Sequence, residues 1–306
     1  MNIAPVALRE MQSAVLDWYA ANGRELAFRR TTDAWAILVA EVIAQQTQAA
    51  RAAEAWTRLI AQFPTPAALA SVAPAVVIRA WRGLGYNRRA IALRTAAIRI
   101  VDEHGGRVPD SLDALESLPG IGPYTARAVL AFAFDRPVAT LDTNVRRVLD
   151  RAVGPLPTSP RAMQAAADGF VPTDAAAAWG HALMDIGATQ CVVRTPRCEA
   201  CPIRATCRTS NGRPQASGAT GERRRMRSKR PTQTFLSTTR WLRGRILDRL
   251  RDATDGMWVT FADPMGDHSP DAVRRELDQL ATDGLLQLAL GPEPRARLVT
   301  SLVAIR

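Results

Sequence analysis

The chain has 306 residues, 47% of them hydrophobic, which is enough for two domains with real cores. Forty Lys and Arg against 29 Asp and Glu give a net charge of +11, which favours a polyanionic partner because neutralising phosphates releases counterions. A basic surface that serves only solubility is the alternative. There is no signal-peptide pattern and no run of about 18 uncharged apolar residues. We therefore expect no membrane partner and a cytoplasmic, nucleoid-associated protein.

Alanine-rich segments with helical periodicity dominate the first two hundred residues, as in 34–60, and strand-like alternation is nearly absent there. The short connections contain Pro and Gly, which favours helices joined by brief loops. We predict a mostly α domain over residues 1–212. The polar stretch that follows, 213–233, contains a basic run and predicts a flexible linker.

Residues 234–306 follow a different pattern. Ser237 is the expected N-cap of a first helix, "GMWVTFADP" (256–264) is a strand candidate, and Ser269 followed by Pro270 predicts a second helix. Two further apolar runs, "LLQLAL" and "RARLVTSLVAIR", are separated by the turn signal "GPEP" and predict paired strands. This order predicts a small α+β, winged-helix-like domain, a common module for docking on DNA or protein.

Two glycines, Gly120 and Gly122, bracket one isoleucine between two predicted helices. The first helix is expected to begin near Asp110 or Ser111, and Pro123 suits the first turn of the second. A dinucleotide site would need a preceding strand and a third glycine, which are missing. Backbone N–H groups of glycines at a helix N-terminus can bind a phosphate, so we predict that the hairpin binds the DNA backbone.

All four cysteines lie within seventeen residues with the spacing C-x6-C-x2-C-x5-C: Cys191, Cys198, Cys201 and Cys207. In a cytoplasmic protein this density favours a metal centre over disulfides. Structural zinc usually uses two tight cysteine pairs on separate arms, whereas only one tight pair occurs here. The loop 191–207 therefore predicts a 4Fe–4S cluster.

These features together resemble the helix-hairpin-helix base-excision DNA glycosylases: the hairpin, Asp142 twenty residues after Gly122, and the cysteine loop. The resemblance covers roughly residues 8–210. Four segments are most similar to the adenine DNA glycosylases of the MutY family: 40–48, 83–90, 141–149 and 182–191. Enzymes of that family remove adenine mispaired with guanine or 8-oxoguanine. The resemblance implies a six-helix barrel plus an iron–sulfur cluster domain, and a monomer that acts on double-stranded DNA with a mispaired or damaged base.

The resemblance also implies four catalytic residues. Glu41 would be the general acid that protonates the adenine, and Asp142 the carboxylate that stabilises the positively charged sugar. Asn144 would orient Asp142, and Tyr124 would line the sugar side of the pocket. Independently of the family, Glu41 lies in the apolar stretch "WAILVAEVIA", where a charge is rarely buried without a function or a partner. Asp142 also suits the N-cap of a helix that begins near Asn144 or Val145.

Other residues are expected around the flipped base. The resemblance places these at the DNA: Gln45, Gln46, Gln48, Tyr86, Gly120, Gly122 and Arg29. It places Phe28, Ala44 and His181 in the base pocket, where each differs from the usual family residue. Phe28 replaces a tryptophan, Ala44 replaces a larger residue, and His181 replaces an acid or amide. Asn87 stands where a second aromatic often follows Tyr86.

Tyr124 distinguishes two reaction types. Related bifunctional enzymes have a lysine there, which forms a Schiff base and nicks the strand, so a tyrosine predicts a monofunctional enzyme. A mismatch thymine or uracil glycosylase of the same fold is one alternative, and a noncatalytic DNA-binding protein is another. Residues 234–306 do not resemble the Nudix-like domain that reads 8-oxoguanine in the family, which leaves recognition of the opposite base open.

Overall fold

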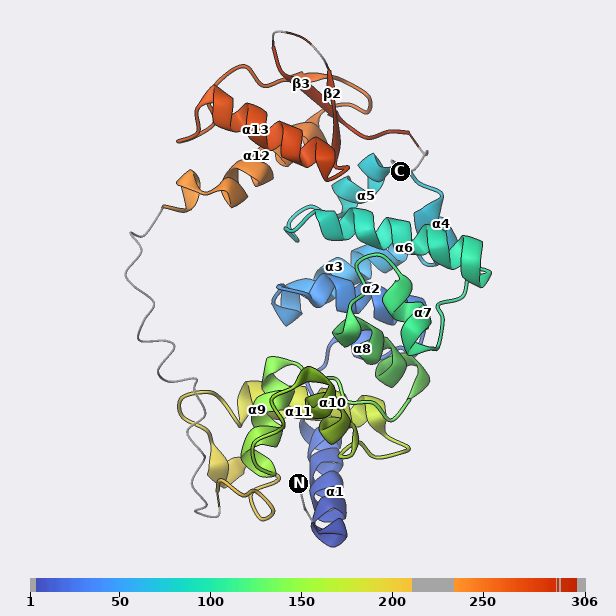
Figure 1. Cartoon of the computed structure of the whole chain (residues 1–306), viewed down its shortest axis with the longest axis vertical. Coiled ribbons are helices and arrows are strands. Elements are labelled where there is room, and N and C mark those ends of the chain that lie inside the picture. Colours follow the sequence, from blue (N-terminus) through green and yellow to red (C-terminus); the bar gives the residue numbers. More distant parts are fainter. Residues whose placement is uncertain (1–3, 211–233, 290, 292, 302–306) are drawn as a thin grey trace. The chain divides into compact units, whose positions relative to one another are not determined.

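The computed structural model describes residues 4–210, 234–289, 291 and 293–301, and the predicted linker 213–233 lies outside these ranges. Helices dominate the described residues, and strands occur only near the C-terminal end (Figure 1). Within these ranges no helix combines the length and apolarity needed to cross a bilayer. Residue contacts divide the chain into two compact units. Among the described residues, the first unit holds 4–41, 110–117 and 121–210, and the second holds 42–109, 118–120 and 234–301.

The first unit is built around α11 (Ala176–Thr189), which packs against α1, α8 and α9. Large side chains of α11 such as Trp179, Leu183 and Ile186 are almost fully buried, so this apolar helix is the centre of the core. The other elements of the unit are α1 (Pro5–Asn22), η1 (Ala27–Arg29), α2 (Ala34–Ala44) as far as Glu41, α7 (Leu112–Ser117), α8 (Pro123–Phe134), α9 (Thr143–Ala152), α10 (Pro160–Asp168) and η2 (Cys198–Ala200).

The predicted hairpin connects α7 to α8. Gly122 is the N-cap of α8 and Pro123 its first residue, as expected. Gly120 has a φ of +79°, and a Cβ there would lie 2.8 Å from the Cβ of Ala92, so both conformation and space require glycine. A Cβ at Gly122 would meet nothing within 4 Å, so open space remains in front of this N-terminus.

The helical part of the second unit consists of the end of α2, α3 (Ala49–Gln62), α4 (Pro66–Ala70), α5 (Pro74–Ala80) and α6 (Arg88–His104). The helical run predicted over 34–60 is interrupted between Ala44 and Ala49. A residue distant in sequence satisfies the carbonyl groups at this interruption. Arg89 donates from Nη1 to the carbonyls of Val42 (2.8 Å) and Ile43 (3.2 Å), which satisfies the C-terminal end of α2.

We call residues 234–301 the C-terminal module. It contains η3 (Phe235–Ser237), α12 (Thr239–Asp252), β1 (Val259–Thr260), α13 (Pro270–Thr282), β2 (Leu286–Ala289) and β3 (Arg295–Leu298). The antiparallel sheet has the order β1-β3-β2, with Val259 opposite Ala296 and Leu286 opposite Leu298. The predicted helix, strand, helix and two-stranded wing are confirmed.

The two helices of the module differ in how well their starts were predicted. Ser269 caps α13 as expected, since its hydroxyl accepts from the N–H of Ala272. The cap of α12 is Thr238, which accepts from the N–H of Trp241, and not Ser237. Ser237 belongs to the 3-10 turn η3, which moves the helix start by one residue.

The module shares a hydrophobic core with α5. Ala75 and Ile78 of α5 are buried in one cluster with α12, α13 and the sheet, in which Leu250 and Phe261 are among the fully buried side chains. The N–H of Ala75 also donates to the carbonyl of Val299 at 2.8 Å. Within the second unit the module therefore packs against α5 (Figure 1).

Candidate active site

Glu41 is a carboxyl group at a buried position of the apolar helix α2. Only 9% of the surface of Glu41 is exposed. Burial, with the negative charge of Asp142 in support, raises the pKa of Glu41 to about 7, although the positive charge of Arg29 and a hydrogen bond from Tyr124 act in the opposite direction. Near neutral pH a large share of Glu41 is therefore protonated, as a general acid requires.

Asp142 is fixed at the N-terminus of α9. Its Oδ1 accepts from the backbone N–H groups of Asn144 (2.8 Å) and Val145 (2.6 Å), so it is the N-cap that the sequence predicted. Its Oδ2 accepts from the side-chain amide of Asn144 at 3.0 Å. Three donors thus orient the carboxylate, and Asn144 makes the contact expected of it.

Asn144 is in turn held by its neighbours in the first unit. Arg147 donates from Nη2 to Oδ1 of Asn144 (2.8 Å) and to the carbonyl of Gly187 (2.6 Å), and from Nε to the carbonyl of Cys191 (2.8 Å). Gly187 of α11 allows close packing here, because a Cβ on it would lie 2.6 Å from the Cβ of Asn144. These contacts join α9, α11 and the start of the cysteine loop.

Tyr124 lies in the first turn of α8 and is partly buried. Its hydroxyl hydrogen-bonds to Glu41. Burial and the nearby Glu41 and Asp142 raise the pKa of Tyr124 far above its usual value, so it remains a neutral donor. The structure therefore brings together three of the four predicted catalytic side chains, Glu41, Tyr124 and Asp142, and links the fourth, Asn144, to Asp142.

Arg29 is buried, although we expected it at the DNA. Its side chain is 6% exposed, and both of its Nη atoms donate to the carboxylate of Asp185, at 2.8 and 2.9 Å. Asp185 also accepts from Nε (2.6 Å) and the backbone N–H (2.8 Å) of Arg24. Burial by itself would raise the pKa of Asp185, but these hydrogen bonds hold it below its usual value. Arg29 thus acts on Glu41 and Tyr124 by its charge.

Asp185 was missed in the sequence, although a signal for it exists. It is the sole acid of α11, an otherwise apolar helix, which is the same pattern that singled out Glu41. A buried acid needs a partner, and two arginines, Arg24 and Arg29, occur in one short segment. The two arginines and Asp185 are separated by about 160 residues of sequence, and they pair because α1 packs against α11. The local sequence does not show this pairing.

The residues predicted for the base pocket are distributed over both units. His181 stacks on Phe132, with ring centroids 4.0 Å apart, and burial followed by the charge of Arg29 lowers its pKa to about 3. It is therefore a neutral imidazole with one donor and one acceptor. Phe28 is partly buried in η1, in the same unit, whereas Ala44 is the last residue of α2 in the second unit.

The glutamines predicted at the DNA lie in a turn and not on a helix. Gln45, Gln46 and Gln48 connect α2 to α3, and Gln46 has a left-handed φ of +58°. Tyr86 lies in the turn between α5 and α6, with a φ of +45° and 52% of its surface exposed. The exposure of Gln46, Gln48 and Tyr86 suits a contact with DNA, and the roles of these residues stay predictions.

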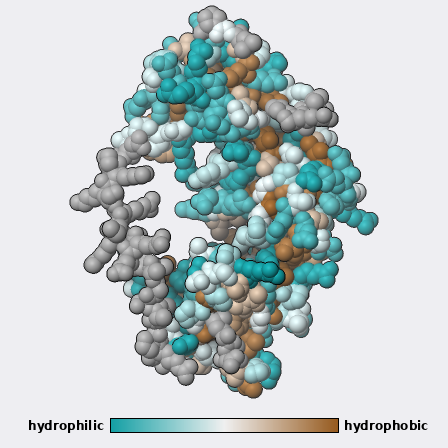
Figure 2. Space-filling view, viewed as in Figure 1, coloured by the Kyte–Doolittle hydropathy of each residue, from teal (hydrophilic) through white to brown (hydrophobic). Residues whose placement is uncertain are grey.

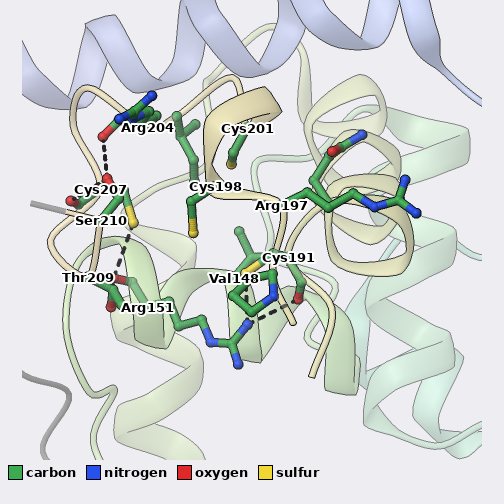
Figure 3. A pocket seen from close by; sticks show the side chains of 13 residues that line it. Val148, Arg151, Cys191, Arg197, Cys198, Cys201, Arg204, Cys207, Thr209 and Ser210 are labelled. Atoms are coloured by element: carbon green, nitrogen blue, oxygen red, sulfur yellow. Dashed lines mark hydrogen bonds between the residues drawn. The ribbon is translucent and has the colours of Figure 1, made fainter. Parts of the chain in front are cut away.

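The four cysteines line one pocket together with Val148, Ile203 and Arg151 (Figure 3). All four are free thiols. The pKa of Cys201 is raised to about 11, first by burial and then by the other three sulfurs, so a thiolate at Cys201 would be stabilised by a bound cation. Arg151 donates to the sulfur of Cys191 at 3.4 Å and to the carbonyl of Val192 at 2.8 Å, which adds positive charge at the rim.

The donor set fits a cluster bound by four cysteines. The four thiols come from a single loop whose sulfurs border one shared cavity (Figure 3). In the described ranges no group of three or more His, Cys, Asp or Glu side chains lies close enough together to hold a single metal ion as the side chains stand, the four cysteines included.

Comparison with known proteins identifies close relatives. Residues 39–172 match the family described as HhH-GPD superfamily base excision DNA repair protein. The chain is 40% identical over 292 residues to "Adenine DNA glycosylase" of Mycolicibacterium smegmatis, covering 94% of both chains. It is 32% identical over 209 residues to "Thymine-DNA glycosylase" of Aeropyrum pernix, covering 65% of this chain and 94% of that one.

Among solved structures, the chain is similar to a thermostable thymine-DNA glycosylase. The TM-score is 0.64 at 26% identity, over 69% of this chain and 99% of that chain.

Proposed function

Because the chain belongs to the adenine DNA glycosylase family of helix-hairpin-helix base-excision repair proteins, we propose that it removes adenine mispaired with guanine or 8-oxoguanine from double-stranded DNA. The observation that supports this reaction best is Glu41, a buried carboxyl with a pKa of about 7 in contact with Tyr124. A purine leaves most easily when a ring nitrogen is protonated, and Glu41 is a proton donor suited to neutral pH.

The reaction follows from the positions of the carboxyl groups. The target nucleotide is flipped out of the duplex, since a stacked base cannot reach Glu41. Glu41 gives its proton to a ring nitrogen of adenine, and the electrons of the N-glycosidic bond leave with the base. The sugar becomes positively charged, and the oriented carboxylate of Asp142 stabilises it until water adds and gives up a proton, which restores the protonated form of Glu41. The products are free adenine and an abasic site.

Tyr124 makes the proposed enzyme monofunctional. Its hydroxyl stays protonated and bonds to Glu41, and it has no amine with which to attack the sugar. The abasic site therefore remains intact in the strand. Trapping of the wild-type protein on DNA by borohydride would contradict this.

The cysteine pocket is the proposed site of the 4Fe–4S cluster that members of this family generally carry. Cys191, Cys198, Cys201 and Cys207 would hold it, and the cluster would fix the loop 191–207. We expect about four irons per chain after anaerobic purification. Zinc in place of iron would contradict the assignment.

The test of the function is a glycosylase assay under single-turnover conditions. Duplexes carry adenine, thymine, uracil or hypoxanthine opposite guanine or 8-oxoguanine, and alkali reveals the abasic site. Release of adenine, lost in the Glu41→Gln variant, supports the proposal. Release of thymine or uracil without adenine would assign the chain to its thymine-specific relatives, and duplex binding without release would make it a noncatalytic DNA-binding protein.

A further inference from the structure

Within the second unit, the C-terminal module contacts one short turn of the helical part. This turn, residues 83–87, connects α5 to α6 and carries Tyr86, and we call it the Tyr86 turn. The visible face of the module is largely hydrophilic (Figure 2), which does not suit an apolar partner there. The contacts that the module makes inside its own unit are therefore the guide to its role.

The Tyr86 turn has a backbone conformation that needs support. Gly83 and Gly85 have φ values of +85° and +66°, which glycine adopts freely. Tyr86 follows with a φ of +45°, which is unusual for a residue with a side chain and persists only where the surroundings hold it. Tyr86 is nevertheless 52% exposed, so burial of its ring is not what supports the turn.

One support comes from α6 and α5. Arg89 donates from Nη2 to the carbonyls of Leu84 (3.1 Å) and Gly85 (3.3 Å). Its guanidinium also lies 5.5 Å from the centroid of the Tyr86 ring. Trp81 donates from Nε1 to the carbonyl of Gly85 at 3.0 Å. These hydrogen bonds fix the residues that precede Tyr86.

The other support comes from the module. Arg251 of α12 is buried, and its Nη2 donates to Oδ1 of Asn87 at 2.6 Å. Its Nε donates to the carbonyl of Ile78 at 3.0 Å and its Nη1 to the carboxylate of Asp248 at 3.1 Å, so the whole guanidinium is held in place. A hydrogen bond from a charged donor is stronger than one between neutral groups. The module therefore fixes the residue that directly follows Tyr86.

The side chain of Asn87 is used for this bond and not for its own helix. Asn87 is the N-cap of α6, where an asparagine commonly accepts from the following N–H groups, yet it makes no such bond. Its amide oxygen accepts from Arg251 instead. A second aromatic often stands at this position in the family, and an aromatic side chain has no amide oxygen to offer. One hydrogen bond thus accounts both for this asparagine and for a buried arginine in the module.

We propose that the C-terminal module positions the Tyr86 turn, and that Arg251 is the positioning residue, which acts through Asn87. The inference rests on the proposed function in one respect, namely that the exposed Tyr86 contacts the duplex. A turn that is already ordered binds more tightly, because its freedom does not have to be lost on binding. The module therefore strengthens duplex binding through Tyr86, and this effect requires no contact between the module and DNA.

The first arm of the test measures the turn without DNA. The N–H of Arg89 donates to the carbonyl of Tyr86 at 2.9 Å. The N–H of Ala90 donates to the carbonyl of Asn87 at 3.0 Å. Hydrogen–deuterium exchange of these two N–H groups therefore reports opening of the turn. Asn87→Ala and Arg251→Met should each speed this exchange about tenfold, since both remove the same charge-assisted hydrogen bond. Asn87→Asp keeps an oxygen acceptor and should restore slow exchange.

The matched control is Arg79→Ala. Arg79 also joins α5 to α12, because it donates to the carbonyls of Arg251 (3.2 Å) and Ala253 (2.9 Å), but it makes no described hydrogen bond to the Tyr86 turn. This variant should leave exchange at Arg89 and Ala90 unchanged. An equal acceleration in Arg79→Ala would show that attachment of the module in general orders the turn, which overturns the role of Arg251.

The second arm measures affinity for a duplex in which a tetrahydrofuran abasic analogue replaces the adenine of an A·G mispair, so that no base is released. Tyr86→Ala should lose about tenfold in affinity through loss of one aromatic contact. Asn87→Ala should lose about threefold to tenfold, because its turn has to be ordered on binding. In the Tyr86→Ala background, Asn87→Ala should cause no further loss, since it acts through that ring.

The outcomes decide the proposal. Faster exchange in Asn87→Ala, its rescue in Asn87→Asp and a non-additive loss of affinity support it. Wild-type exchange in Asn87→Ala, additive losses, or an unchanged affinity in Tyr86→Ala overturn it. Thermal melting checks the fold of each variant, and the variants of the partly exposed Asn87 decide the matter if Arg251→Met does not fold. If the wild-type protein releases no adenine in the separate assay, the proposed function fails, and exchange and binding still decide the role of Arg251.

Discussion

The reactivity of Glu41 depends on opposing effects of a few residues. Burial and Asp142 favour its protonated form, while Arg29 and the hydroxyl of Tyr124 favour its ionised form. Arg29 has this influence without leaving its own ion pair, because Asp185 holds it in place. The pKa of about 7 is the balance of these effects, and changing one of them should move it in a known direction.

The first prediction concerns the pH dependence of base release. Only protonated Glu41 can donate, so the single-turnover rate should be level below pH 7 and fall about tenfold per pH unit above it. Tyr124→Phe removes a hydrogen bond that lowers the pKa of Glu41, so the alkaline limb should move to higher pH. A pH–rate profile of both proteins measures this. A limb that moves to lower pH would show that the Tyr124 hydroxyl does not act on Glu41 in this way.

The second prediction separates the two roles of Asp142. Asparagine is as good an N-cap as aspartate, so Asp142→Asn should preserve α9 and the melting temperature. It removes the charge that stabilises the sugar, so the rate of base release should fall by about 10²–10³-fold. Asp142→Ala is the comparison, since it loses both cap and charge and should also cost about 1 kcal/mol of stability. Near-normal activity of Asp142→Asn would leave Asp142 as a cap alone.

At the scale of elements, α9 connects the carboxylate to the cysteine loop. Its N-terminus is capped by Asp142, and one turn later Arg147 contacts Asn144, Gly187 and the carbonyl of Cys191. The position of Asn144, and through it that of Asp142, is therefore coupled to α11 and to the start of the loop. Small displacements of a catalytic carboxylate lower the reaction rate strongly, because a shift of about 1 Å can cost on the order of 10²-fold in rate.

The third prediction tests this coupling. Arg147→Ala should lower the rate of base release by about 10- to 100-fold and leave duplex affinity nearly unchanged, since Arg147 positions Asn144. The matched control is Arg146→Ala, which removes the same charge from the same helix at an exposed position paired with Asp150. Equal effects of the two variants on rate would contradict a positioning role for Arg147.

The sequence predicted the elements whose signals are local. Pro123 at the start of α8, Asp142 before α9 and Ser269 before α13 are side chains that act on the adjacent turn, and all three predictions are confirmed. The break after Ala44 was not predicted, and the side chain that satisfies its carbonyls, Arg89, lies more than forty residues away. In the site, the apolar surroundings of Glu41 were visible, whereas the pairing of Arg29 with Asp185 required the tertiary packing of two helices.

At the scale of the whole molecule, the C-terminal module also shows that the sequence predicts local elements but not the tertiary contacts between them. Its winged-helix pattern was visible because periodicity and turn residues are local. Its attachment was not visible, because the apolar contacts that hold it include Ala75 and Ile78, two residues that in the sequence look like any other helix core. The polar composition of 213–233 predicts only that a linker connects the module to the rest of the chain. It gives no sign that the module packs against α5.

The last prediction follows from that packing. A site for a sequence-specific protease is inserted after residue 220, and the full-length protein is then cleaved. We expect residues 221–306 to remain bound to the rest and to co-elute in size-exclusion chromatography. The reason is that burial of Ile78, together with the hydrogen bonds from Arg251 to Ile78 and from Arg79 to Ala253, does not depend on the covalent connection. A tether adds an effective concentration on the order of mM, so cleaved fragments at ~10 µM stay together only if the packing itself is strong.

The control is the same cleavable protein with Ile78→Asp, which places an unpaired charge in the shared core and should release the fragment after cleavage. Separation of the cleaved wild-type fragments at ~10 µM would mean that the connecting chain provides most of the attachment. Retention would mean instead that the module is part of the second unit in solution. In that case deleting residues 234–306 would expose Ala75 and Ile78, and any loss of activity in such a deletion would report on stability as well as on DNA contacts. Substitutions in the full-length chain are for this reason the sharper way to measure what the module contributes to binding.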